Sequence, residues 1–114
     1  MPATVISTSS GEARVSQDLF SAAGATDAIR VSGGVIVQAT GTGTAVSLVV
    51  ERSTIDPNTS NSTPNWARVE DSALSGNPST GMTASQYVEP AIAWWRVRVV
   101  SVTGSVFVSI SGKA

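Results

Sequence analysis

The residues of this chain best suited to acid–base chemistry are its carboxylates, at Glu12, Asp18, Asp27, Glu51, Asp56, Glu70, Asp71 and Glu89. Glu70 and Asp71 are neighbours, and in a strand two neighbouring side chains point to opposite faces rather than toward one substrate. A two-carboxylate glycosidase needs a fixed pair on either side of a cleft. The chain has neither cysteine nor histidine, so it lacks a thiolate nucleophile, a zinc–thiolate site and the commonest general base. We therefore expect no catalytic residues, no metal site and no enzymatic activity.

The segment Thr40-Gly41-Thr42-Gly43-Thr44 is the one glycine pattern that could cradle a phosphate. A dinucleotide or phosphate loop requires a further glycine and a helix directly after the loop. Here the third glycine is missing, and the residues that follow favour a strand. The pattern predicts a β-turn, and we expect no cofactor.

Composition limits the possible partners. Only 13% of the 114 residues are charged and the net charge is -1, so no basic footprint for nucleic acid is predicted. The N-terminal residues lack the charged and apolar regions of a signal peptide, and no apolar run approaches the ~18 residues that span a membrane. We expect a single soluble domain made in the cytoplasm, with no nucleic-acid and no membrane partner.

The strongest structural signal lies between Glu89 and Gly112. Residues of alternate polarity form two runs around the turn Val102-Thr103-Gly104-Ser105, which predicts a β-hairpin. The first run directs Trp95, Val97 and Val99 to one face, and the second run does the same with its own apolar residues. These are Val106, Val108 and Ile110.

Shorter strands separated by polar turns fill the rest of the chain. In residues 44–52, Val46, Leu48 and Val50 alternate with polar positions, while residues 53–65 and 72–85 are rich in Ser, Thr, Asn, Pro and Gly and predict loops. Gly33-Gly34 predicts a tight turn or a bulge. Seven to nine short strands without an amphipathic helix predict an all-β fold, an antiparallel β-sandwich that is immunoglobulin-like or jelly-roll-like. We expect an N-terminal arm at 1–24, a sandwich domain at 25–114, and a core centred on Trp66 and Trp95.

If Trp95 faces the core, the same alternation directs its neighbour Trp94 outward. Trp94, Arg96 and Arg98 then share the outer face of their strand, and Phe107 would lie beside them on the hairpin partner. Trp and Arg are enriched at interface hot spots. We therefore predict a protein-binding surface made of these four residues. The alternative is that the chain's own N-terminal arm covers this face, and an arm exchanged between subunits would satisfy both interpretations.

The stretches GGVIVQATGTGTAVSLVVERS, NWARVEDSA and WWRVRVVSVTGSVFVSISG, in this order with polar loops between them, resemble small β-sandwich virion proteins of tailed bacteriophages. This family of head decoration or cement proteins and immunoglobulin-like modules is matched over about Ile29 to Gly112. The resemblance implies a non-enzymatic protein in the virion, bound to the outer face of the major capsid protein shell, commonly as a homo-oligomer (a trimer). The resemblance includes no motif that would identify particular binding residues.

Two other functions remain open at this point. The first is a structural module of the phage tail, in its tube, its completion complex or a fibre. The second is a carbohydrate-binding β-sandwich, in which Trp94 or the region of Trp66 would stack on sugar rings.

Overall fold

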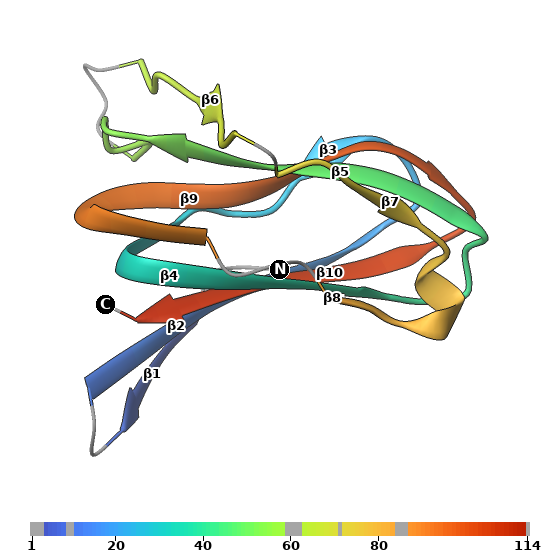
Figure 1. Ribbon diagram of the computed structural model, residues 1–114, viewed down its shortest axis with the longest axis horizontal. Coiled ribbons are helices and arrows are strands. Elements are labelled where there is room, and N and C mark those ends of the chain that lie inside the picture. Colours follow the sequence, from blue (N-terminus) through green and yellow to red (C-terminus); the bar gives the residue numbers. More distant parts are fainter. Residues whose placement is uncertain (1–3, 9–10, 59–62, 71, 84–86, 114) are drawn as a thin grey trace.

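A computed structural model describes residues 4–8, 11–58, 63–70, 72–83 and 87–113. These residues form strands with one short 3₁₀ turn (Figure 1). The elements are β1 (Thr4–Thr8), β2 (Gly11–Phe20), β3 (Gly24–Ala25), β4 (Ile29–Thr40), β5 (Ala45–Ser53), β6 (Ala67–Arg68), β7 (Leu74–Gly76), η1 (Pro78–Thr80), β8 (Met82–Thr83), β9 (Tyr87–Thr103) and β10 (Val106–Lys113).

All strand pairs found in the described residues are antiparallel, and together they form one sheet in the order β1-β2-β10-β4-β9-β5-β6. The short strands β3, β7 and β8 attach to β9, β5 and β4. The predicted all-β antiparallel class is confirmed. Hydrogen bonding runs without a break from β1 to β6, so the two separate sheets that define a sandwich are not found.

The sheet bends because β4 and β9 each change partners along their length. β4 pairs with β9 from Ile29 to Val35, and on its other edge it pairs with β10 from Ser32 to Thr40. β9 leaves β4 near Trp95 and continues beside β5 as far as Thr103. In Figure 1, β5 and β9 consequently lie above β4, β10 and β2. Gly33 and Gly34, predicted as a turn or a bulge, lie at a register shift inside β4, so the bulge is the correct alternative.

The hydrophobic core is formed by alternate residues of β4, β5, β9 and β10. Trp95 is completely buried in it, as are the predicted inward residues Val97, Val99, Leu48 and Val50. Val106, Val108 and Ile110 of β10 are equally buried. The prediction for Trp66 is wrong, because this side chain is only half-buried. Trp66 lies directly before the short strand β6 and contacts the side chain of Arg96.

The predicted hairpin of β9 and β10 is also wrong. In the described residues β10 pairs with β2 and β4, and β9 pairs with β3, β4 and β5. The turn at Gly104 therefore carries the chain from one half of the bent sheet to the other. Alternation cannot distinguish these cases, because a strand that crosses over directs the same residues to the core as a strand that folds back beside its neighbour.

Two connections between the halves pack against each other and depend on glycine. The β4–β5 connection donates from Gly43 N to Ser105 O (2.8 Å) and from Thr44 N to Thr103 O (3.0 Å). Gly104 has φ +86°, and a Cβ on it would lie 2.8 Å from Gly43 Cα. The φ angle and the close approach both require glycine at residue 104.

The N-terminal segment belongs to the sheet as far as the structure describes it. β2 pairs with β10 from Ala13 to Phe20, and β1 pairs with the opposite edge of β2. Ser16 and Phe20 of β2 are buried, at 0% and 8% exposure. In the described residues, β2 thus lies between β1 and β10 in the sheet.

Candidate functional site

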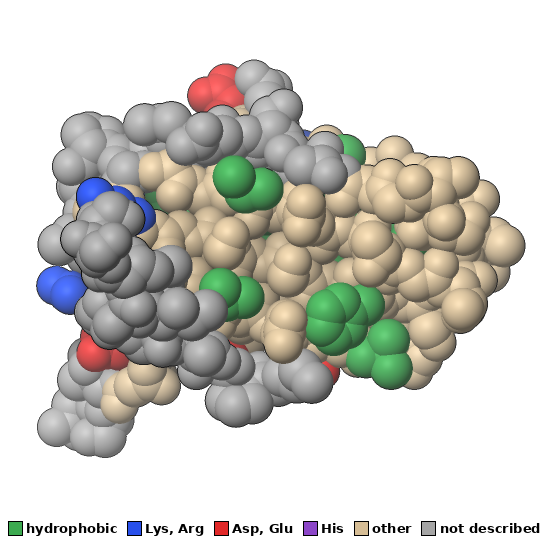
Figure 2. Space-filling view, turned by 90° about the horizontal axis from the view of Figure 1, so that it is seen from below, with side chains coloured by type: hydrophobic (Ala, Val, Ile, Leu, Met, Phe, Trp, Pro, Cys, Tyr) green, Lys and Arg blue, Asp and Glu red, His purple; other side chains and the backbone are tan. Residues whose placement is uncertain are grey.

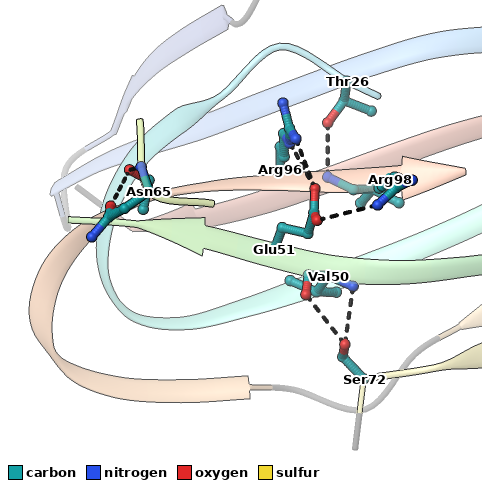
Figure 3. A network of polar contacts seen from close by, with 9 residues as sticks. Thr26, Val50, Glu51, Asn65, Ser72, Arg96 and Arg98 are labelled. Carbon is teal, nitrogen blue, oxygen red and sulfur yellow. Dashed lines mark hydrogen bonds and ion pairs between the residues drawn. The ribbon is translucent and has the colours of Figure 1, made fainter. Parts of the chain in front are cut away.

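The outer face of the β5–β9 half carries an ion pair at its centre. Glu51 of β5 lies directly opposite Arg96 of β9, and Arg96 approaches one carboxylate oxygen through both Nε and Nη2, each at 2.9 Å. Arg98 Nη1 lies 3.8 Å from the other oxygen, Oε2. Glu51 is buried, with 7% of its surface exposed, so these contacts compensate a carboxylate that has lost most of its water. Figure 3 shows both arginines directed at Glu51.

Trp66 completes this cluster from the other side of the arginine. The Arg96 guanidinium lies over the indole ring at 4.1 Å from its centroid, which is close enough for a cation–π interaction. Arg96 is thus held between a carboxylate and an aromatic ring. Its conformation is fixed by these contacts, as a side chain that lines a binding site must be.

A hydrogen-bond network closes the polar loop that precedes Trp66. Asn65 Oδ1 accepts from Thr54 N (3.0 Å), and Asn65 Nδ2 donates to Thr54 Oγ1 (2.9 Å). Ser53 Oγ lies 2.8 Å from Asn65 Oδ1 and accepts from Asn65 N at 3.2 Å. The residue before Trp66 is therefore tied to the end of β5, and Figure 3 shows Asn65 in these contacts.

The cluster borders a hollow of about 390 Å³ that opens to solvent. Its walls are Trp66 and Arg96, the β3–β4 connection (Thr26, Asp27 and Ala28), and Pro57 and Asn58 of the polar loop. Thr26 is itself held by Val97 of β9, because Thr26 N donates to Val97 O (2.9 Å) and Val97 N donates to Thr26 Oγ1 (3.0 Å). The wall formed by the β3–β4 connection is thus anchored to β9.

The four residues predicted as one interface do not share a face. Trp94, Arg96 and Arg98 lie on the outer face of β9, as expected. Trp94 is half-buried, and the Arg30 guanidinium lies 5.8 Å from its ring centroid. Phe107 lies on β10 in the other half of the bent sheet, because the turn at Gly104 crosses between the halves. The structure therefore separates Phe107 from the other three residues.

Phe107 belongs instead to a three-by-three grid on the outer face of β2, β10 and β4. The register aligns Leu19, Phe107 and Thr40 in one row across the three strands. The next rows are Gln17, Ser109 and Gln38, and then Val15, Ser111 and Ile36. None of these nine residues is charged. We call this surface the uncharged face.

Large apolar side chains on the uncharged face are open to solvent. Leu19 is 62% exposed and Ile36 is 44% exposed, while Phe107 and Val15 are half-buried. Figure 2 looks onto this side of the molecule and shows hydrophobic side chains among uncharged ones, with the visible charged side chains toward the margins of the view. Exposed apolar surface without charge is typical of a surface that contacts another protein.

Sequence reasoning missed Leu19 and Ile36, and it missed Asp27 and Asn58 in the hollow. The outward positions of residues 15–19 and 36–40 carry no charge, and this signal was available in the sequence. The sequence did not indicate that these positions share a face with Phe107, because that arrangement depends on β10 lying between β2 and β4. Asp27 and Asn58 are in loops, and no periodic pattern indicates where a loop side chain lies.

Among the described residues, no three acidic side chains come together in a group that could hold a metal ion. In the same part of the chain, no helix has the length and apolar character to cross a membrane. Comparison with protein families, curated proteins and solved structures found no match to this chain.

Proposed function

We propose that this chain is a structural protein of a tailed bacteriophage particle, a head decoration or cement protein that binds the outer face of the major capsid protein shell. The observation that carries the proposal is the uncharged face of β2, β10 and β4, with its exposed Leu19 and Ile36. The resemblance of the strand order to phage virion proteins supports the choice of partner.

The uncharged face suits such a contact because desolvating it costs little. No charge has to be removed from water when the nine grid residues are covered. The apolar side chains gain from burial, while Gln17, Gln38 and the serines between them can exchange water for hydrogen bonds to a partner. Depletion of charge at the centre of an interface is the compositional feature that distinguishes interfaces from other surface.

The size of this face favours repeated attachment over one tight contact. Three strands ~4.8 Å apart, with outward residues every ~6.8 Å, give a grid of roughly 300 Å². A stable interface takes about 800 Å² from each partner, so the grid alone supports a weak contact. Weak contacts to a shell add up to strong binding when several copies of the chain are joined in one oligomer. The homo-oligomer that we propose, a trimer, would join three copies in this way.

The test is binding to empty shells assembled from the major capsid protein of the same phage. The wild-type chain should sediment with the shells and saturate at a fixed copy number. Leu19→Asp places a charge at the most exposed apolar position of the uncharged face and should reduce shell occupancy at least tenfold. Val100→Asp is the matched control, because Val100 is also apolar and 48% exposed but lies on β9 in the other half of the sheet.

The proposal fails if the wild-type chain does not sediment with the shells, or if the Leu19→Asp and Val100→Asp variants bind the shells equally well. Electron microscopy of particles carrying the labelled chain then gives its position. Label confined to the tail would replace head decoration with the tail-associated module.

A further inference from the structure

We infer that the hollow beside Trp66 is a binding site for a neutral sugar residue of a glycan. The hollow lies outside the β5–β9 half, whereas the uncharged face lies outside the β2–β10–β4 half. A chain attached through its uncharged face would therefore keep the hollow open to the medium. The inference does not depend on the proposed shell contact.

The walls of the hollow hold the side chains that a pyranose requires. Trp66 provides an indole beside the hollow, and the Arg96 guanidinium covers one face of this ring at 4.1 Å from its centroid. The sugar would pack its apolar C–H face on the opposite face of the indole. Asp27 provides acceptors for hydroxyl groups, and Asn58 provides both donors and an acceptor. The polar groups thus surround an aromatic platform, which is the usual arrangement when a pocket fixes the orientation of a small ligand.

The charges of the site point to a neutral ligand. The charged residues among those that line the hollow are Asp27 and Arg96, one of each sign. Arg96 is already engaged by Glu51 at 2.9 Å, so an acidic sugar would have to compete with a buried carboxylate for it. A cation attracted to Asp27 would be repelled by the Arg96 guanidinium, which lines the same hollow. The hydroxyl groups of a neutral sugar neither compete with Glu51 for Arg96 nor carry a charge that Arg96 would repel.

The size and rigidity of the hollow fit a small ligand. Its volume of about 390 Å³ is near the lower end of the range for small-molecule pockets, about 300–1,000 Å³. Three of its lining residues are held by contacts with the sheet or with the end of β5. Trp66 is placed by the Asn65 network, Arg96 by Glu51, and Thr26 by Val97. A ligand that binds there loses little affinity to ordering of the protein.

The experiment is a printed array of neutral oligosaccharides built of glucose, galactose, mannose and N-acetylglucosamine, with sialylated and sulfated oligosaccharides beside them. The full chain should bind a subset of the neutral glycans. The best-bound oligosaccharide is then titrated calorimetrically against variants. Trp66→Ala should weaken binding at least tenfold, and Trp94→Ala should leave it unchanged.

Trp94 is a matched control because it is a half-buried tryptophan on the same half of the sheet, beside an arginine, but does not line the hollow. If Trp66→Ala lowers the melting temperature, Asp27→Asn tests the same site. Asp27 is exposed, so this variant should fold normally and weaken binding several-fold. Leu19→Asp should bind glycans like the wild type, which separates this site from the shell contact.

Three outcomes would overturn the inference. They are an array on which no neutral glycan binds, binding to acidic glycans alone, and equal binding by the Trp66→Ala, Asp27→Asn and Trp94→Ala variants. None of them bears on attachment to shells.

Discussion

The ion pair between Glu51 and Arg96 should contribute measurably to folding, although it lies on the outer face of the sheet. Two charges 2.9 Å apart attract by about 6 kcal/mol at an effective dielectric constant of about 20. Most of this is offset by the desolvation of Glu51, which is 7% exposed. Hydrogen bonds to charged groups contribute about 1.5–3 kcal/mol net. We expect Glu51→Gln to lower the free energy of unfolding by about 2 kcal/mol.

The assay is equilibrium unfolding in urea, followed by tryptophan fluorescence, for Glu51→Gln, Arg96→Met and the double variant. The coupling energy of this cycle isolates the pair from the packing of each side chain. We expect a coupling of about 1.5 kcal/mol, most of which should persist in 1 M salt because the carboxylate is shielded from the solvent. The melting temperature of Glu51→Gln should fall by about 8 °C, at about 4 °C per kcal/mol.

Arg98→Gln is the control for the same carboxylate. Arg98 Nη1 lies 3.8 Å from Glu51 Oε2, and 58% of the Arg98 side chain is exposed. Exposed pairs of this kind contribute at most about 1 kcal/mol, and we expect a loss below about 0.5 kcal/mol. A coupling of Glu51 to Arg96 that is no larger than the effect of Arg98→Gln would refute the reasoning, because geometry and burial would then not determine the strength of the pair.

Two further substitutions test the backbone of the bent sheet. Ser72 is completely buried, and its Oγ accepts from Val50 N (3.1 Å) and lies 3.2 Å from Val50 O. Ser72→Ala removes the partner of a buried N–H and should cost about 1–3 kcal/mol in urea unfolding, whereas Ser79→Ala in the exposed 3₁₀ turn should cost clearly less. Gly104→Ala should destabilise the chain by about 2 kcal/mol or more, since φ is +86° and the new Cβ would lie 2.8 Å from Gly43 Cα. Gly81→Ala has a similar φ, +80°, but no atom within 4 Å, so a loss as large as that of Gly104→Ala would show that the packing of the two connections is unimportant.

The part of the core formed by regular strands was predictable from the sequence. Trp95, Val97 and Val99 of β9 and Val106, Val108 and Ile110 of β10 are buried as their alternation predicts. Strand geometry alone determines which residues share a face, so the partner strand need not be known. The same argument correctly directed Trp94, Arg96 and Arg98 outward.

The candidate sites were only partly predictable. Arg96 was recognised as an outward residue, but its contacts with Glu51 and Trp66 join positions far apart in the chain. Trp66 was assigned to the core because large aromatic residues are usually buried. In the structure it directly precedes the two-residue strand β6 and stacks on the side chain of Arg96 instead. Segments this short provide too few alternations to fix a face.

The sequence by itself determined that the chain is an antiparallel all-β protein, and which residues of its long strands face inward. These properties follow from the two-residue period of the strand and from the preference of apolar side chains for the interior. Only the tertiary structure decided that β10 lies between β2 and β4 rather than beside β9. That choice separates Phe107 from Trp94 and creates the uncharged face, and the two loop walls meet only on the folded sheet to form the hollow. Pairing between distant strands depends on the packing of the whole core, which no local pattern records.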